Sequence, residues 1–232
     1  GKVGPINRQN AAMTALDAQI SVKHLDPVAA GFLDSTVGMS LLDAQAAPAV
    51  SDGQTLDCSG TVHMDRLQLR KTGSPAPKAV DLDYNVTQNL QDNSGQLHSA
   101  DVHVGNLAIH LSGVYRLVPD NPWLNVKVSG QDLPIDELQA LMTAAGVTLP
   151  NGSVLKGGTL TIALTATGPA NDLVINGPLA ADNTSLVGFN MGSKISGIAA
   201  LGGIKTGDTT EIQKLRLNLL ATNAGLKTDN IY

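Results

Sequence analysis

Five histidines are the residues of this chain that could most readily bind a metal ion. Zinc sites combine histidine and cysteine at short, characteristic spacings, and no cysteine or second histidine stands at such a spacing here. His98 and His103 are five residues apart, so on one continuous strand they would point to opposite faces. We therefore expect no metal and no cofactor, and solvent-facing strand positions for His24, His63, His98, His103 and His110.

Residue types suited to catalysis are present but are not arranged for it. Cys58 lies on the apolar parity of a predicted strand with no recognisable base, which favours a buried, inert thiol. Asp81 and Asp83 share the polar face of one strand, whereas paired catalytic carboxylates normally come from separate elements. The glycine-rich run 197–207 lacks a phosphate-binding motif. No nucleophile-elbow context surrounds the candidate serines Ser153, Ser193 and Ser196. We predict that the chain is not an enzyme.

Composition restricts the classes of partner. The 232 residues include 15 Lys or Arg and 20 Asp or Glu, for a net charge of −5. Nucleic-acid binding needs clustered basic residues that displace counterions. The densest basic run here is Arg70-Lys71, so we expect no nucleic-acid partner. Hydrophobic residues are 42% of the chain but aromatic residues only 3%, which favours broad aliphatic sheet faces.

Cysteine usage and the start of the chain bear on its compartment. Cys58 is the only cysteine, so no intrachain disulfide can form and the redox compartment stays open. The longest nearly apolar stretch is 195–204, shorter than the ~20 residues that a spanning helix needs. The sequence begins at Gly1 without a methionine or a basic leader. We expect a targeting or membrane segment to be missing from it.

Alternation of apolar and polar residues is the dominant pattern. Its clearest example is Val80, Leu82, Tyr84 and Val86, each followed by a polar residue. Units of about 8–12 residues end in Gly, Pro, Asn or Asp turns. Repetition with one apolar face predicts a mainly β fold, a long antiparallel meander that forms a curved open sheet or β-groove.

Two segments depart from this pattern. Residues 43–54 are predicted as a loop closed by an Asp52-Gly53 turn. After Met64 the parity slips by one and continues at Leu67 and Leu69, which predicts a β-bulge inside one long strand.

Two or three short helices are expected to cover the apolar face or the end of the sheet. Asp26-Pro27 is typical of an N-cap and a first helical position, and predicts a helical turn at about 27–33. Residues 134–145 have acidic residues in the first turn and apolar residues on one face. A third helix, at about 194–203, is predicted as a cap of the apolar face.

The apolar face itself is either the plain core of a closed sheet or an exposed trough for acyl chains. A trough needs aliphatic area and exclusion of water, and few directional groups, so no signature residue would reveal it. Strand parity predicts the following lining residues: Leu82, Tyr84, Val86, Ile109, Leu111, Val126, Ile162, Leu164, Ile175, Leu217 and Leu219.

The second half of the chain contains a series of segments in a characteristic order. They are LPIDELQAL at 133–141, LPNGS at 149–153 leading to KGGTL at 156–160, GFNMGSK at 188–194, and IAALGGIKTG at 198–207 followed by TEI at 210–212. In these segments and their spacing, residues 130–231 resemble the AsmA family of bacterial envelope proteins. Residues 16–129 resemble that family only in style.

The resemblance implies a periplasmic protein, held in the bacterial inner membrane by an N-terminal helix absent from this chain, and a role in outer-membrane biogenesis. The family is related to TamB-like and bridge-like lipid-transfer proteins, whose curved sheets form a hydrophobic groove. The implied function is transport of phospholipid or another acyl lipid between the inner and outer membranes. The alternative is a non-catalytic structural or docking module with a closed core that binds other envelope-assembly proteins.

The same resemblance suggests the domain organisation. We expect a loosely ordered start at 1–15 and a single AsmA-like β-rich domain at 16–231. Within it, 16–129 would hold variable strands and 130–231 the half that is characteristic of the family.

Overall fold

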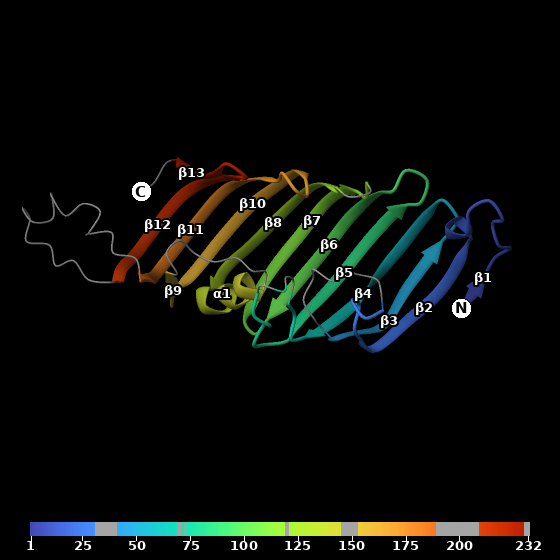
Figure 1. Ribbon diagram of the computed structural model, residues 1–232, viewed down its shortest axis with the longest axis horizontal. Helices are drawn as coiled ribbons and strands as arrows, with labels where there is room; N and C mark the ends of the chain where they lie inside the picture. The colour runs from blue at the N-terminus through green and yellow to red at the C-terminus, as the bar shows by residue number, and fades with distance from the viewer. Residues whose placement is uncertain are drawn as a thin grey trace, which may run out of the picture.

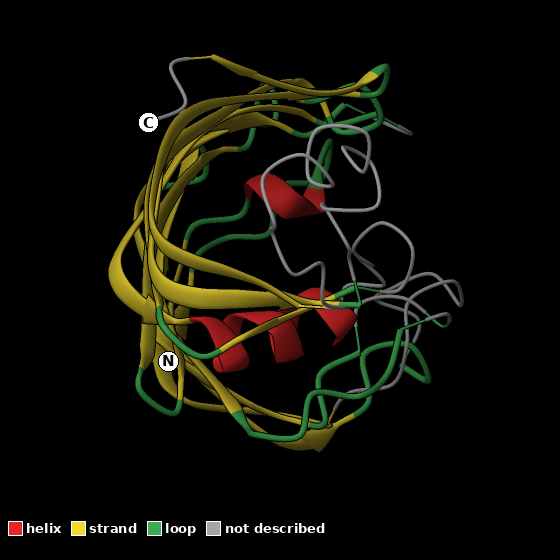
Figure 2. Cartoon of the chain, turned by 90° about the vertical axis from the view of Figure 1, so that its left-hand side faces the viewer, coloured by secondary structure: helices red, strands yellow, loops and turns green. Residues whose placement is uncertain are grey.

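One antiparallel sheet of 13 strands, curved like the letter C in cross-section, makes up most of the computed structural model (Figures 1 and 2). The structure describes residues 1–30, 41–68, 71, 73–118, 121–144, 153–188 and 209–229. The sheet order is β1-β2-β3-β4-β5-β6-β7-β8-β10-β11-β12-β13, and the short β9 pairs with β11. The predicted mainly β meander with a curved open sheet is therefore confirmed.

The strands follow one another along the chain. Their bounds are β1 Lys2–Val3, β2 Leu16–Leu25, β3 Leu41–Ser51, β4 Thr55–Asp65, β5 Val80–Asn89, β6 Ser94–Val104, β7 Leu107–Arg116, β8 Trp123–Pro134, β9 Val154–Lys156, β10 Thr159–Pro169, β11 Val174–Val187, β12 Thr209–Thr222 and β13 Gly225–Asp229. The helical elements are the 3-10 helix η1, Ala11–Met13, and the α-helix α1, Ile135–Ala144.

The two long rims of the sheet differ in how they join the strands. At the upper rim in Figure 1, the hairpins β3–β4, β5–β6, β7–β8, β10–β11 and β12–β13 turn back within short connections. The first of these is the predicted Asp52-Gly53 turn, where the Asp52 carboxylate accepts hydrogen bonds of 2.7 Å from the backbone N–H groups of Gln54 and Thr55. Helix α1 lies at the opposite rim, on the inner side of the curve (Figure 2).

Helix α1 confirms the helix predicted at 134–145, and side-chain contacts attach it to the sheet. Glu137 accepts a 2.8 Å hydrogen bond from the backbone N–H of Asn106, in the turn between β6 and β7, and forms an ion pair with Lys78. Lys78 is the main cause of the lowered pKa of Glu137, so the carboxylate stays ionised and in place. The apolar side of α1 then covers the inner face along this rim, beneath the middle strands of the sheet. The buried cluster there is Leu67, Ala76, Val80, Val104, Leu107, Leu133, Ala144 and Ile162.

The loop predicted at 43–54 is wrong for most of its length, because residues up to Ser51 form β3. Low hydrophobicity and a proline concealed this strand. Its buried side chains are the small Ala44, Ala47 and Ala49, and Pro48 falls where the β3–β4 register shifts, between Gln45 and Ala49. Proline lacks a backbone donor and is tolerated in a sheet at such an irregularity.

The bulge predicted after Met64 is also wrong. Strand β4 ends at Asp65, and Arg66 turns the chain with a positive φ of 54°. Leu67 leaves the sheet and is buried in the core cluster, where its backbone carbonyl accepts a hydrogen bond from the N–H of Ala76. The parity slip thus marks the end of a strand.

Of the two other predicted helices, the one at about 27–33 can be followed in part. Asp26 caps a turn at 27–30, where its carboxylate accepts 2.9 Å hydrogen bonds from the N–H groups of Val28 and Ala29. Within the described residues this segment is a single turn, and the rest of the helix predicted at 27–33 lies outside them. The helix predicted at 194–203 lies outside the described residues altogether. In the first fifteen residues, β1 pairs with β2 and η1 follows.

Candidate functional site

The inner, concave face of the sheet is the candidate site. Directly opposed residues in neighbouring antiparallel strands share a face, so the strand register shows which side chains meet. One row runs Tyr84–Ala100–Leu111–Val128–Leu164 from β5 to β10. A second row runs Val86–Leu97–Gly113–Val126–Ala166–Ile175–Ala221 and reaches β12.

The register brings all eleven predicted lining residues to this face. Leu82 is joined through Val102 to Ile109, and Ile162 is joined through Leu179 to Leu217. Leu219 is two residues from Leu217 on β12 and is opposed to Gly177 of β11. Whether these side chains contact a lipid stays a prediction.

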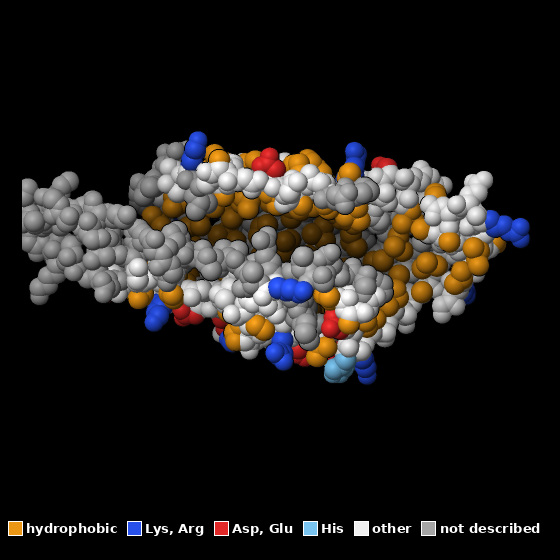
Figure 3. Space-filling view, viewed as in Figure 1, with side chains coloured by type: hydrophobic (Ala, Val, Ile, Leu, Met, Phe, Trp, Pro, Cys, Tyr) orange, Lys and Arg blue, Asp and Glu red, His pale blue; other side chains and the backbone are white. Residues whose placement is uncertain are grey.

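The concave face is closed beneath α1, along part of one rim, and partly open elsewhere. Beneath α1, Val80, Val104, Leu107 and Leu133 are at most 1% exposed and form a true core. Of the predicted lining residues, Ile162 is buried in this cluster, and Ile109 and Leu164 pack against it. The others are half-buried, and Figure 3 shows hydrophobic side chains lining a hollow along the molecule.

Three polar side chains on this face, those of Tyr84, Tyr115 and Cys58, are neutral. Burial removes water from these groups, and this desolvation is the main cause of the raised pKa values of Tyr84, Tyr115 and Cys58. All three side chains therefore hold their protons at neutral pH. The two rows named above contain no charged residue. An apolar face with a few neutral hydroxyl groups can hold hydrocarbon without the cost of desolvating a charge.

Gly177 allows two neighbouring strands to approach closely on this face. Its φ is +140°, and a Cβ added there would lie 2.3 Å from the carbonyl oxygen of Ala163 on β10. A residue with a side chain would clash with that neighbouring backbone, so the close approach of β10 and β11 requires glycine.

The outer, convex face is largely polar and holds the paired histidines and the two aspartates considered above, whereas Cys58 is opposed to Val86 on the concave face and is half-buried. His63 lies 2.6 Å from Asp81, and His110 lies 2.7 Å from Asp101. The hydrogen bond with Asp81 is the main cause of a raised pKa at His63. Asp83 accepts a hydrogen bond from the Thr61 hydroxyl, so the predicted carboxylate pair is divided between two different partners.

The expectation that His98 and His103 point to opposite faces is wrong. His98 lies where the β5–β6 register shifts, between Asn85 and Val86, and its Nε2 is 3.0 Å from the Thr87 hydroxyl on the convex face. His103 is opposed to Asp81, on the same face. The extra residue at the irregularity changes the parity. Within the described ranges, no group of three or more histidine, cysteine or acidic side chains is placed to hold a metal ion.

No protein-family model matches the chain, and no curated protein or solved structure matches it either. No helix in the described segments is long and apolar enough to cross a bilayer.

Proposed function

We propose that this chain is a non-enzymatic groove module that holds the acyl chains of phospholipid, as the periplasmic part of an AsmA-like protein serving outer-membrane biogenesis. The observation that carries the proposal is the continuous apolar, half-exposed concave face of an open sheet. Hydrocarbon gains about 25 cal/mol for each Å² of apolar surface removed from water, without directional contacts. Such a face offers that gain to an acyl chain.

The length of the face suits an acyl chain. Four steps in the sheet order lead from β5 to β10 and six lead from β5 to β12. At about 4.8 Å for each step, the first row is about 19 Å long and the second about 29 Å. The hydrocarbon core of a bilayer is about 30 Å thick, so one leaflet's chains need about half of that. A single phospholipid tail fits within the rows with space to move along them.

The family assignment and the location in the envelope are part of the same proposal. The AsmA-like segments between 133 and 212 support them, and a link to the inner membrane would come from a segment outside this chain. The proposal names phospholipid as the ligand, with other envelope-assembly proteins as further partners.

Site-specific photo-crosslinking tests the proposal with controls from the same strands. A photo-reactive residue replaces Leu111 or Leu164 on the concave face, and Ser112 or Ala163 on the convex face, in protein made in a bacterium. We expect crosslinks to phospholipid from the first pair alone, and lipid adducts in native mass spectra. A lipid-free mass together with no crosslink from Leu111 or Leu164 refutes the proposal.

A docking module with a closed core is the second candidate function, and the core beneath α1 favours it. Leu107 is 0% exposed and Leu133 is 1% exposed, as in an ordinary protein interior. On this alternative, the chain binds envelope-assembly proteins by its outer surface. Crosslinks to protein from Ser112 or Ala163, with none to lipid from the concave face, would support it.

A further inference from the structure

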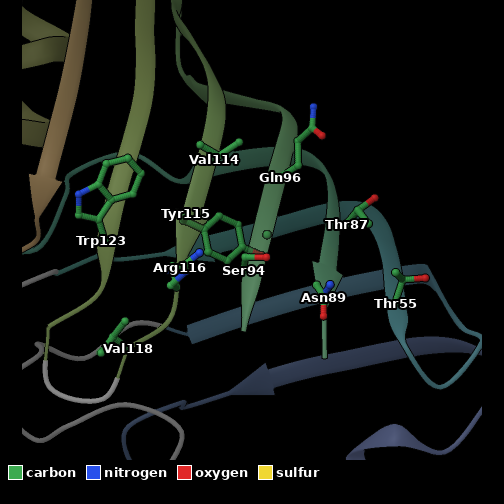
Figure 4. Close-up of a pocket in the computed structure, with 11 residues that line it drawn as sticks. Thr55, Thr87, Asn89, Ser94, Gln96, Val114, Tyr115, Arg116, Val118 and Trp123 are labelled. Carbon is green, nitrogen blue, oxygen red and sulfur yellow. The ribbon is translucent and has the colours of Figure 1, made fainter. Parts of the chain in front are cut away.

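A second apolar pocket lies at the rim of short turns, and most of its lining side chains belong by register to the convex face. Figure 4 shows these residues. The pocket encloses about 740 Å³, within the range of about 300–1,000 Å³ that is typical of small-molecule sites. We call it the rim pocket. Its lining residues are Thr55, Thr87, Asn89, Ser94, Gly95, Gln96, Val114, Tyr115, Arg116, Val118 and Trp123.

Three large apolar side chains of the rim pocket are exposed, although the convex face around them is mostly polar. Val114 is 43% exposed, Val118 45% and Trp123 39%. They come from the end of β7, the following turn and the start of β8, so one hairpin supplies all three. Large apolar side chains gathered in a recess, instead of scattered singly, are typical of a binding site.

Arg116 gives the rim pocket a cation whose guanidinium forms no hydrogen bond with another described residue. The register places it directly between Ser94 of β6 and Trp123 of β8. No carboxylate forms an ion pair with Arg116 in the part of the chain that the structure describes. Asp92, in the turn before β6, has a lowered pKa. The main cause is its hydrogen bonds from Ser94, and the positive charge of Arg116 is a smaller cause.

Most other polar groups of the pocket are already engaged. The Thr87 hydroxyl bonds to Asp57, and the Ser94 hydroxyl bonds to Asp92. The Asn89 side chain accepts from the backbone N–H of Gln91. Arg116 is the one cation among the lining residues, so an anionic group entering the pocket would pair with it beside an apolar wall.

We propose that the rim pocket binds a single-chain amphiphile with an anionic head, of the fatty-acid class. The carboxylate pairs with the Arg116 guanidinium, which is suited to planar anions, and the chain lies against Val114, Val118 and Trp123. This site is separate from the groove and goes beyond the proposed function. The recessed shape and the net charge of −5 favour one bound molecule over contact with an anionic bilayer.

Trp123 is the only tryptophan, so its fluorescence reports on this pocket directly. The purified full chain is titrated with monomeric 12-bromododecanoate, whose bromine quenches tryptophan at near contact. We expect saturable quenching that unbrominated dodecanoate reverses by competition. An amphiphile in the groove lies on the other face of the sheet, so it should not quench Trp123.

Three variants separate the parts of the site. Arg116→Gln should weaken binding of 12-bromododecanoate about tenfold, as expected for a lost charge-assisted hydrogen bond, and leave 12-bromododecanol unchanged. Val114→Asp should abolish binding of both. Val174→Asp is the matched control, because Val174 is also on the convex face at this rim, is 37% exposed and lies outside the pocket. Thermal unfolding confirms that each variant is folded.

Three results overturn the inference: no saturable quenching, equal affinity for the acid in Arg116→Gln, or quenching only by vesicles of brominated phospholipid. The last result would assign the patch to membrane contact. The outcome is independent of the groove experiment. Lipid crosslinks at Leu111 without quenching at Trp123 reject the rim pocket alone, and quenching without crosslinks rejects the groove alone.

Discussion

Leu107 and Leu111 lie on the same face of β7 but should respond very differently to the same substitution. Leu107 is 0% exposed beneath α1, whereas Leu111 is half-buried in the row between Ala100 and Val128. Leu→Ala at a fully buried site costs about 3 kcal/mol, from lost transfer energy and the cavity left behind. For Leu111, with about half of that burial, we expect about 1.5 kcal/mol.

Urea unfolding of Leu107→Ala and Leu111→Ala, with the lipid removed by detergent exchange, measures both costs. Phospholipid carried by each purified variant is then quantified by mass spectrometry. We expect Leu107→Ala to lose stability and keep its lipid, and Leu111→Ala to lose lipid with the smaller cost in stability. Equal costs at the two positions would refute the reasoning, because they would mean that the concave face is a closed core along its length.

Three further predictions concern the elements that shape and support the sheet. Gly177→Ala should destabilise the protein by more than about 1 kcal/mol in urea unfolding, because the added Cβ would clash with the Ala163 carbonyl oxygen. Gly225→Ala is the control, since Gly225 also has a positive φ, +129°, but has open space where a Cβ would lie. Equal losses of stability in the two variants would show that the clash is not the cause. His63 has a raised pKa in the folded state, so its contribution to stability is fully present below the unfolded pKa and is lost as pH rises through the folded one. His63→Gln should therefore reduce the change of the unfolding free energy with pH between pH 5.5 and 8.5. An unchanged pH profile would contradict the pairing of His63 with Asp81. Glu137 has a lowered pKa, so its contribution to stability is present above the unfolded pKa and is lost as pH falls through the folded one. The protection of α1 amides against hydrogen exchange, corrected for the intrinsic exchange rate at each pH, should therefore fall on acidification, and Glu137→Gln should remove that response.

Local pattern was sufficient wherever an element carries its own periodic signal. The alternation at 80–87 predicts β5, and the acidic first turn with one apolar side predicts α1, because both depend on neighbouring residues only. Strand β3 has no such signal, since it is built from alanines around Pro48 and is held by its ladders to β2 and β4. Such a strand is specified by its partners, and its own sequence reads as a loop.

The residues of the candidate site also fall into those that local pattern predicted and those that it missed. Strand parity brought the eleven apolar residues to one face, because successive side chains of a strand alternate. Parity failed at His98, where an extra residue in the β5–β6 ladder reverses the direction of the side chain. The rim pocket was missed, because Val114, Arg116 and Trp123 belong to a polar face and gather only through the register of β6, β7 and β8.

The sequence by itself determined a mainly β meander with one aliphatic face and one helix, since these follow from residue period and capping chemistry. Only the tertiary structure decided which part of that face is closed. Leu107 and Leu111 are the same residue type on the same strand, and no local rule distinguishes them. Glu137, bonded to the Asn106 backbone and to Lys78, holds α1 over the part of the face that contains Leu107. Contacts between residues so distant in the chain exist only after the sheet has curved, so burial along β7 is a property of the whole fold.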